Sequence, residues 1–269
     1  MKDLFFIREM IFPFGCGSCG KALLTREDSY LGLCHDCRSL IESSLNTMNL
    51  CSICGKPLIS EKETCLICRE KILGGINQYN EWLYKLRTIF PYTGKFKNIL
   101  GSYKFKKSIG MGNFFAHCLY IALNDLLKGR HNPNENEEIA WVPVPPKPGK
   151  IKEKGWDQIQ YLAELLEKTY KQAVRQRGTK KAALYPHKPS FTLPVCRCLE
   201  RLKSRSQKEL NREERKKNLK GRILCVKPPP HTAVIFDDVF TTGATLNACA
   251  EALIGAGAKK VYGICLFYD

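Results

Sequence analysis

The clearest hydrophobic pattern lies near the carboxyl end of the chain. The segment "TAVIFDDV" (232–239) is an apolar run that ends in two acids, and it predicts a strand. A short turn leads to "ATLNACAEALIGAG" (244–257), which predicts a helix that ends at glycine. "KKVYGICLF" (259–267) predicts a second strand. A strand, a helix and a strand in this order form a βαβ unit, so we expect a parallel sheet.

The central part of the chain predicts further helices and one strand. Apolar residues recur at helical spacing on both sides of a glycine-containing break, which predicts helices over about 94–106 and 109–128. "IAWVPVP" (139–145) predicts a short strand that ends in prolines, and an amphipathic helix is expected from Asp157 onwards. Residues 178–192 are expected to form a loop insertion.

The composition is that of a globular chain. Its 269 residues suffice for one large domain or two modest ones, and 44% of them are hydrophobic. No apolar run reaches the roughly 18 residues that a membrane span needs. Residues 1–15 are apolar but interrupted by charges, and they lack a small-residue cleavage site. We therefore interpret them as a lead-in to the next segment rather than a signal peptide, and we expect a cytoplasmic protein.

Eight of the 14 cysteines occur as four C-x-x-C pairs between residues 16 and 68. "CGSCGKAL" (16–23) resembles "CSICGKPL" (51–58), and "CHDC" (34–37) and "CLIC" (65–68) close the two units. Two tandem copies of one small module are therefore expected. In a chain expected to stay in the cytosol, this spacing favours metal over disulfides.

Four thiolates on two such turns can occupy the corners of a tetrahedron, which is the geometry of structural zinc. Because protein ligands would fill both sites, we predict two structural Zn2+ ions. The predicted ligands are Cys16, Cys19, Cys34, Cys37, Cys51, Cys54, Cys65 and Cys68. The spacing leaves open whether leading and closing pairs are exchanged between the two units.

The formal net charge of +17 is concentrated in one part of the chain. Residues 147–227 hold 23 Lys and Arg against 8 Asp and Glu. A field of this sign attracts phosphate, either of nucleic acid or of a small polyanion, while a merely solvated basic surface is the alternative. Within this part, 201–222 is strongly basic and poorly periodic, which predicts a mobile loop or a frayed helix.

The turn that follows the strand at 232–239 has the features of an anion site. A glycine-containing turn between a strand and a helix directs backbone N–H groups at one point, and the helix N-terminus adds partial positive charge. Thr241, Thr242 and Thr245 add hydroxyl donors, and Gly243 permits close backbone approach. The segment lacks the GxxxxGK[ST] pattern, so it predicts a monophosphate site rather than a P-loop for nucleoside triphosphates.

Asp237 and Asp238, just before this turn, would repel a phosphate in contact with them. They are suited instead to groups that donate hydrogen bonds, such as sugar hydroxyls near the phosphate. A 5-phosphoribosyl group meets both requirements. "VIFDDVFTTGAT" (234–245) resembles the phosphoribosyl pyrophosphate motif of type I phosphoribosyltransferases, in which the acids bind the ribose hydroxyls and the loop binds the 5-phosphate.

A wider resemblance is to the ComF family, whose members combine an N-terminal cysteine-rich zinc module with a phosphoribosyltransferase-like domain. The family is linked to natural competence and the uptake of transforming DNA. Besides the cysteine pairs and the loop, three segments match in order: 92–107, 141–166 and 201–218. Where the family usually has Arg-Gly-Phe-Asn-Gln, this chain has "KGWDQ" (154–158), and lysine cannot supply the bidentate fork of arginine.

The resemblance implies the fold, the domains and the site. It implies an α/β fold whose type I phosphoribosyltransferase-like parallel sheet is flanked by helices (76–269) and preceded by a small double zinc-ribbon module (1–75). Asp237 and Asp238 would have the catalytic role. Phosphoribosyl pyrophosphate, with Mg2+, would contact Asp237, Asp238, Val239, Thr241, Thr242, Gly243, Ala244, Thr245 and Lys147. Further loop contacts are implied for Lys154, Gln158, Arg201, Arg205 and Gln207.

Two functions of different classes are compatible with these features. The first is Mg-dependent transfer of phosphoribose from phosphoribosyl pyrophosphate to a nitrogen nucleophile that the sequence does not identify. The second is a non-catalytic factor in natural transformation that keeps the fold and binds single-stranded DNA or DNA-processing proteins. Basic charge does not separate them, because phosphoribosyl pyrophosphate and DNA are both polyanions.

Overall fold

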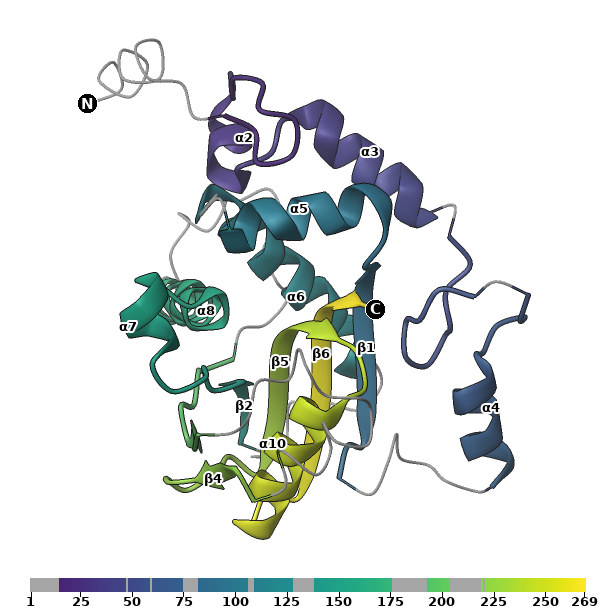
Figure 1. Ribbon diagram of the computed structural model, residues 1–269, viewed down its shortest axis with the longest axis vertical. Coiled ribbons are helices and arrows are strands. Elements are labelled where there is room, and N and C mark those ends of the chain that lie inside the picture. The colour runs from purple at the N-terminus through teal and green to yellow at the C-terminus, as the bar shows by residue number, and fades with distance from the viewer. Residues whose placement is uncertain are drawn as a thin grey trace.

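The protein is built around a four-stranded sheet, shown here in a computed structural model (Figure 1). The strand order is β1-β6-β5-β2, and every neighbouring pair is parallel. The strands of this sheet are β1 (Lys85–Pro91), β2 (Ile139–Pro143), β5 (Thr232–Phe240) and β6 (Lys260–Tyr268). A separate antiparallel pair consists of β3 (Leu199–Arg201) and β4 (Ile223–Cys225). The structure describes residues 15–46, 48–58, 60–74, 82–105, 109–127, 138–175, 193–203, 219 and 221–269.

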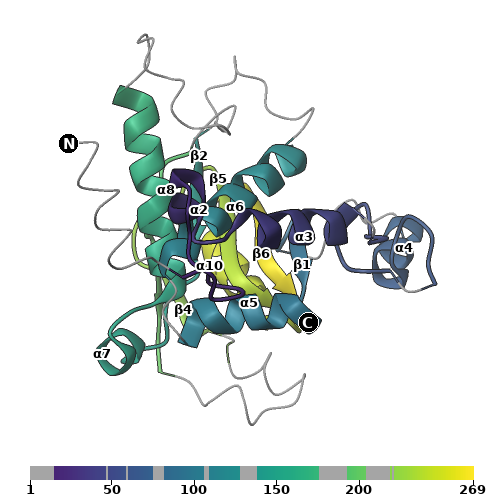
Figure 2. The ribbon, with the colours of Figure 1, turned by 90° about the horizontal axis from the view of Figure 1, so that it is seen from above.

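Helices cover both faces of the sheet (Figures 1 and 2). Helices α5, α6 and α8 pack on one face, and α10 packs on the other together with β3 and β4. These helices are α5 (Gly94–Phe105), α6 (Gly112–Leu127), α8 (Gln158–Arg175) and α10 (Ala244–Gly255). Shorter elements are the 3-10 helix η1 (Ile109–Met111) and the helix α7 (Lys150–Lys154).

The central strand β5 is buried on both faces. Val234 and Phe236 belong to the core beneath α6 and α8, whereas Ala233 and Ile235 belong to the core beneath α10. Neighbouring residues of a strand point to opposite faces, so a sheet with helices on both sides needs apolar residues at every position. This explains why the sequence runs continuously apolar up to the two acids.

The predicted parallel α/β arrangement is confirmed. The βαβ unit is β5, α10 and β6, and the predicted helices and the predicted strand at 139–145 correspond to α5, α6, α8 and β2. The sequence pattern assigned no strand to β1. This strand lies at the edge of the sheet, and its buried residues alternate with half-buried ones up to Phe90, so its apolar signal is weak.

Some predicted segments lie outside the described residues. These are the lead-in apart from residue 15, the loop insertion at 178–192, and most of the basic segment 201–222. The end of the first predicted domain, at residue 75, also lies there, and the division into two domains stays a prediction. No helix within the described ranges is both long enough and apolar enough to cross a membrane.

The two cysteine-rich units pack against the α/β part and share its cores. The first contains α2 (Arg26–Leu31) and α3 (His35–Asn46), and the second contains α4 (Leu66–Leu73). Leu33 of the first unit joins the core that holds Phe115, and Leu58 of the second joins the core that holds Leu86. Units of this size bury little by themselves, so the shared cores supply the burial that they lack.

The second unit also covers the edge of the sheet. The backbone N–H and the side-chain hydroxyl of Thr88, in β1, both donate to the carbonyl of Cys54, over 2.8 and 2.9 Å. Gly55 follows with a φ of +75°, and a Cβ atom there would lie 2.2 Å from the Thr88 carbonyl oxygen. Only glycine fits this contact, because the atom in the way belongs to the backbone.

We expect Gly55→Ala to destabilise the protein more than Gly20→Ala does. Gly20 occupies the same place in the first unit with a φ of +77°, but its Cβ would meet nothing within 4 Å. Gly20→Ala therefore destabilises the protein only through the strain of alanine at a left-handed φ, which costs about 1 kcal/mol. Gly55→Ala adds a steric clash to this strain and costs about 2 to 4 kcal/mol. Urea unfolding of the zinc-loaded variants measures both, and equal losses would contradict the docking of Gly55 on β1.

Candidate functional site

Each cysteine-rich unit brings its own four thiols together. In each group all four sulfur atoms lie within 4.8 Å of one another: Cys16, Cys19, Cys34 and Cys37 in the first, and Cys51, Cys54, Cys65 and Cys68 in the second. The pairs are therefore joined within each unit and not exchanged. The Sγ atoms of Cys19 and Cys34 are 3.7 Å apart, and those of Cys54 and Cys65 are 3.8 Å apart. A zinc tetrahedron with Zn–S bonds of about 2.3 Å has sulfur–sulfur edges of about 3.8 Å, so both groups fit zinc.

The leading pair of each unit forms a tight knuckle. The N–H of Gly20 donates to the carbonyl of Cys16 over 2.8 Å, and the N–H of Gly55 donates to the carbonyl of Cys51 over 2.9 Å. Both glycines, which directly follow the second cysteine, have a positive φ, a backbone region that glycine adopts without steric penalty. The closing pairs lie at or just before the first turns of α3 and α4, so helix formation and metal binding hold the same residues.

The leading thiol of each unit is favoured for ionisation. Burial raises the pKa of Cys16, but hydrogen bonds from the backbone of Cys19 and Cys34 outweigh it and lower this pKa to about 7. Hydrogen bonds from the Cys54 thiol, and also from that of Cys68, lower the pKa of Cys51. Zinc binds the thiolate form, so a thiol that ionises readily suits a zinc ligand.

The predicted anion-binding turn joins β5 to α10. Gly243 has a φ of +76° and caps the N-terminus of α10, and the N–H of Ala244 donates to the hydroxyl of Thr242 over 3.4 Å. The turn borders an open hollow at the end of β5. The residues that line the hollow are Asp237, Val239, Phe240, Thr241, Thr242, Gly243, Ala244, Thr245 and Leu246. The structure thus gathers the predicted phosphate contacts of this segment around one hollow.

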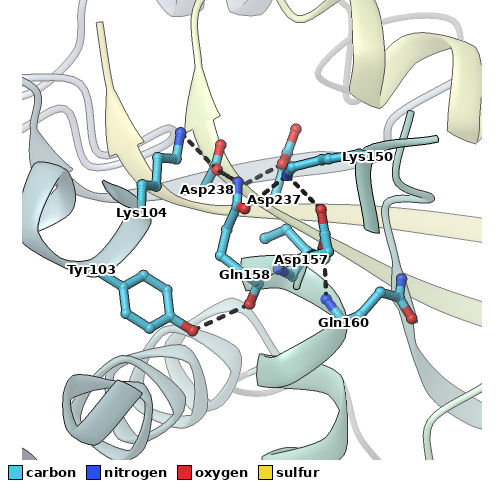
Figure 3. Close-up of polar contacts among 9 residues, drawn as sticks. Tyr103, Lys104, Lys150, Asp157, Gln158, Gln160, Asp237 and Asp238 are labelled. Atoms are coloured by element: carbon cyan, nitrogen blue, oxygen red, sulfur yellow. Dashed lines mark hydrogen bonds and ion pairs between the residues drawn. The ribbon is translucent and has the colours of Figure 1, made fainter. Parts of the chain in front are cut away.

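The two acids at the end of β5 point to different surroundings (Figure 3). Asp238 is buried and forms an ion pair with Lys104, over 2.7 Å between Nζ and Oδ2. The side-chain amide of Gln158 donates to the same carboxylate. Asp237 accepts a hydrogen bond of 2.8 Å from the backbone N–H of Asp238. Asp238 is therefore compensated by α5 and α8, whereas Asp237 remains available at the hollow.

The loop before α8 fixes Gln158 in this arrangement. Asp157 caps α8, accepting hydrogen bonds from the N–H groups of Ile159 and Gln160 over 2.9 and 3.0 Å. Lys150, the first residue of α7, donates to the Asp157 carboxylate and, over 2.7 Å, to the Gln158 amide oxygen. Because its amide oxygen accepts from Lys150, the amide nitrogen of Gln158 is directed at Asp238, as Figure 3 shows.

The carboxyl group of Asp237 holds its proton unusually strongly. Burial raises its pKa to about 7, and the neighbouring charge of Asp238 acts in the same direction. Lys104 opposes this shift. The guanidinium of Arg201, in β3, interacts electrostatically with Asp237. Burial lowers the pKa of Arg201, and the charge of Asp237 is among the groups that oppose that shift. A carboxyl group that titrates near neutral pH is typical of a functional site.

Among the described residues, five of the implied contacts are not part of the lining of the hollow: Asp238, Lys147, Lys154, Gln158 and Arg201. Lys147 is exposed on the loop after β2, and Lys154 is exposed at the end of α7. Arg201 interacts electrostatically with Asp237, a residue of the lining, but is not itself part of the lining. Arg205 and Gln207 lie outside the described residues.

The sequence did not indicate two lysines that form ion pairs and hydrogen bonds with Asp238, Asp157 and Gln158. Lys104 lies within the segment 92–107 that resembles the ComF family, but nothing in its local sequence connects it with Asp238, 134 positions away. Lys150 lies four residues before Lys154, the residue that the motif comparison singled out. The cation that contacts the "KGWDQ" motif therefore comes from the start of α7 and not from the motif itself.

Comparison with known proteins finds one matching domain family and relatives that span most of the chain. Residues 7–70 match the family described as a double zinc ribbon domain. Competence protein ComFC of Bacillus subtilis is 22% identical over 84% of this chain and 79% of the relative. Competence protein ComFC of Streptococcus pneumoniae is 27% identical over 91% of this chain and 94% of the relative. Competence protein F of Haemophilus influenzae is 25% identical over 93% of this chain and 95% of the relative. The resemblance to the ComF family is confirmed. It covers most of the chain, so it extends well beyond the cysteine-rich units.

Elemental analysis of the zinc-loaded protein is expected to find about two Zn per chain, since eight thiolates form two tetrahedral sites. Cys51→Ser is expected to lower this to about one, because three ligands hold structural zinc poorly. Cys118→Ser is the control: it removes a thiol on α6, outside both groups, and keeps about two Zn. One Zn or none in the wild-type protein would contradict the two-site assignment.

The raised pKa of Asp237 predicts how stability depends on pH. The folded state keeps this proton up to about pH 7, whereas the unfolded chain loses it near 3.8, so the folded state binds more protons between these values. The free energy of unfolding therefore falls as the pH rises through this window. Asp237→Asn removes the effect, so wild type should lose stability relative to the variant between about pH 4 and about pH 7 in urea unfolding. A constant difference over this range would contradict the assignment.

Proposed function

We propose that the protein binds 5-phosphoribosyl pyrophosphate at the end of β5. One observation carries this proposal: two acids stand directly before a glycine-containing turn, and Asp237 lines the same hollow as Thr241–Thr245. A site for phosphate alone has no use for a carboxylate at its border, because like charges repel. A site for a phosphorylated sugar needs donors for the phosphate and carboxylate acceptors for the sugar hydroxyls. The strand β5 and the turn after it supply both kinds of group.

The turn is suited to the 5-phosphate. Backbone N–H groups at the start of α10 point outward from the helix, and the 12-residue helix adds partial positive charge at this end. The hydroxyls of Thr241, Thr242 and Thr245 add donors at the same hollow. The ring of Phe240 closes the inner side, since a Cβ at Gly243 would lie 3.0 Å from it.

The carboxylates are suited to the ribose hydroxyls. Asp237 lines the hollow and keeps free acceptor capacity besides its hydrogen bond from the Asp238 backbone. Asp238 is held in place by Lys104 and Gln158, so the pair is preorganised before a ligand arrives. If Mg2+ accompanies the pyrophosphate, Asp237 and Asp238 are the oxygen ligands at hand, and the ion would neutralise charge on the leaving group.

The reaction compatible with this site is transfer of phosphoribose. The bond between C1 of the ribose and the pyrophosphate oxygen breaks, and pyrophosphate leaves with the electron pair. A nitrogen nucleophile forms the new bond to C1 and loses a proton. Asp237 and Asp238 would hold the sugar by its hydroxyls while charge develops on the ring, and Lys104 and Arg201 place positive charge nearby.

The names of the relatives suggest the process in which the protein acts. All three are competence proteins, and each is similar to this chain over most of its length. We therefore place the protein in natural competence, acting in the cytoplasm as its cysteine content suggests.

A second candidate is non-catalytic binding of single-stranded DNA, and the observation that favours it is the net charge of +17. Phosphate contacts from Lys and Arg release counterions, so affinity for an oligonucleotide would fall steeply with added salt. That binding would not need Asp237 or Asp238, because carboxylates repel a polyanion.

Calorimetric titration with phosphoribosyl pyrophosphate and Mg2+ tests the proposal. Asp237→Asn combined with Asp238→Asn should weaken binding about tenfold to a hundredfold, since hydrogen bonds to charged groups contribute about 1.5 to 3 kcal/mol. Asp36→Asn combined with Asp125→Asn is the control, because it changes net charge equally at exposed positions. Equal affinity in both double variants, or no binding by wild type, would overturn the proposal. Salt-sensitive oligonucleotide binding that survives the Asp237/Asp238 change would favour the second candidate.

A further inference from the structure

A lysine of the second cysteine-rich unit contacts the sheet next to the anion-binding turn. Lys56 comes directly after Gly55, and its backbone carbonyl accepts from the N–H of Cys51 over 2.8 Å, so its backbone belongs to the metal knuckle. Its Nζ lies 5.6 Å from the ring centroid of Tyr268, the last residue of β6. A lysine at this distance is attracted to the face of the ring.

The ring of Tyr268 in turn supports the turn itself. Tyr268 and Phe240 are register partners in neighbouring strands, and their rings stack with centroids 5.8 Å apart and planes at 25°. Phe240 is buried, and its ring would lie 3.0 Å from a Cβ at Gly243. A continuous series of contacts therefore runs from the knuckle of the second unit, through Lys56, Tyr268 and Phe240, to the residue that caps α10.

The knuckle end of this series is fixed to the same sheet. The carbonyl of Cys54 accepts both hydrogen bonds from Thr88 in β1, next to β6. The knuckle is thus held relative to the strands, and Lys56 is held relative to the knuckle. A shift of the knuckle would move the cation away from the ring and remove the support beneath the turn.

The internal repeat provides a comparison within the same chain. Lys21 occupies the position of Lys56 in the first unit, after Cys16, Cys19 and Gly20. Its side chain is 71% exposed and forms a surface ion pair with Asp36, over 3.6 Å. The lysine of this motif thus contacts the sheet in the second unit and faces solvent in the first.

We propose that Lys56 and Tyr268 are positioning residues for the anion-binding turn, so that the second cysteine-rich unit sets how well the site binds phosphate. The inference rests on the proposed binding of phosphoribosyl pyrophosphate. The affinity of a site made of backbone N–H groups depends on their orientation, and displacement of donors by a fraction of an ångström weakens several hydrogen bonds together. Phe240 lines the hollow, and Lys56 is linked to it through the ring of Tyr268, so Lys56 acts indirectly on the ligand.

Calorimetry with phosphoribosyl pyrophosphate and Mg2+ tests this with three matched variants. Lys56→Met should bind about two- to fivefold more weakly than wild type, as loss of one partly exposed cation–π contact implies. Lys21→Met removes the equivalent lysine of the first unit. Lys97→Met removes a cation–π contact of the same 5.6 Å length, over Tyr92. Both controls should bind like wild type, and all three should keep about two Zn per chain.

Substitution of the ring separates positioning from general stability. Tyr268→Phe keeps both ring contacts but loses the hydroxyl, which also interacts with Lys56, so it should lose less affinity than Tyr268→Leu. Tyr268→Leu should lose about as much affinity as Lys56→Met. Equal binding by Lys56→Met and Lys21→Met would overturn the inference and leave the proposed function intact. Equal losses in Tyr268→Phe and Tyr268→Leu would overturn the role of the ring.

A measurement without ligand keeps the inference testable if wild type binds no phosphoribosyl pyrophosphate, in which case the proposed function fails. Hydrogen–deuterium exchange of the peptide with Thr241–Thr245 should then be about two- to fivefold faster in Lys56→Met than in Lys21→Met, because an unsupported turn opens more often. Identical exchange in the two variants would overturn the inference.

Discussion

The placement of two adjacent carboxylates at the end of β5, one buried and one bordering the hollow, is the constraint around which the site is arranged. An uncompensated buried charge costs several kcal/mol, so it either finds partners or keeps its proton. Asp238 finds partners in Lys104 and Gln158, from two different helices. Asp237 instead has a pKa raised to about 7, because burial and the neighbouring charge both favour its protonated form. Helices α5, α7 and α8 thus converge on one strand end, and the sheet order brings them there.

The second cysteine-rich unit contacts the edge of the same sheet. A parallel sheet leaves unpaired backbone groups along its edge strand, and such edges are prone to pair with other chains. The carbonyl of Cys54 binds Thr88 of β1 and covers that edge. Zinc would hold the knuckle rigid, since a unit of this size has too little core of its own. The cysteine group of the second unit, the edge of the sheet and the anion-binding turn are therefore neighbours in space, although they are far apart in the chain.

Much of this site was predictable from local sequence. Zinc ligands follow from the C-x-x-C spacing, and the turn follows from two acids, threonines and a glycine between a strand and a helix. These features work through residues close in the chain, so their pattern survives in the sequence. The edge strand β1, with alternating burial, and the ion pair of Lys104 with Asp238 leave no such pattern. They depend on which elements become neighbours, and that is settled by long-range packing.

By itself, the sequence determined the residues that bind metal, the βαβ unit and the position of the anion-binding turn, because each depends on spacing within a short segment. Tertiary structure decided that each unit gathers its own four cysteines into one group that fits zinc. It also decided that Lys150, rather than Lys154, contacts Gln158, the residue that donates to Asp238. It also gave two identical motifs different surroundings. Lys21 and Lys56 follow the same Cys-x-x-Cys-Gly, yet one faces solvent and the other lies over Tyr268. The reason is physical: among the described residues, the second knuckle docks on the edge of the sheet and the first does not, and a local motif carries no information about the surface that it meets.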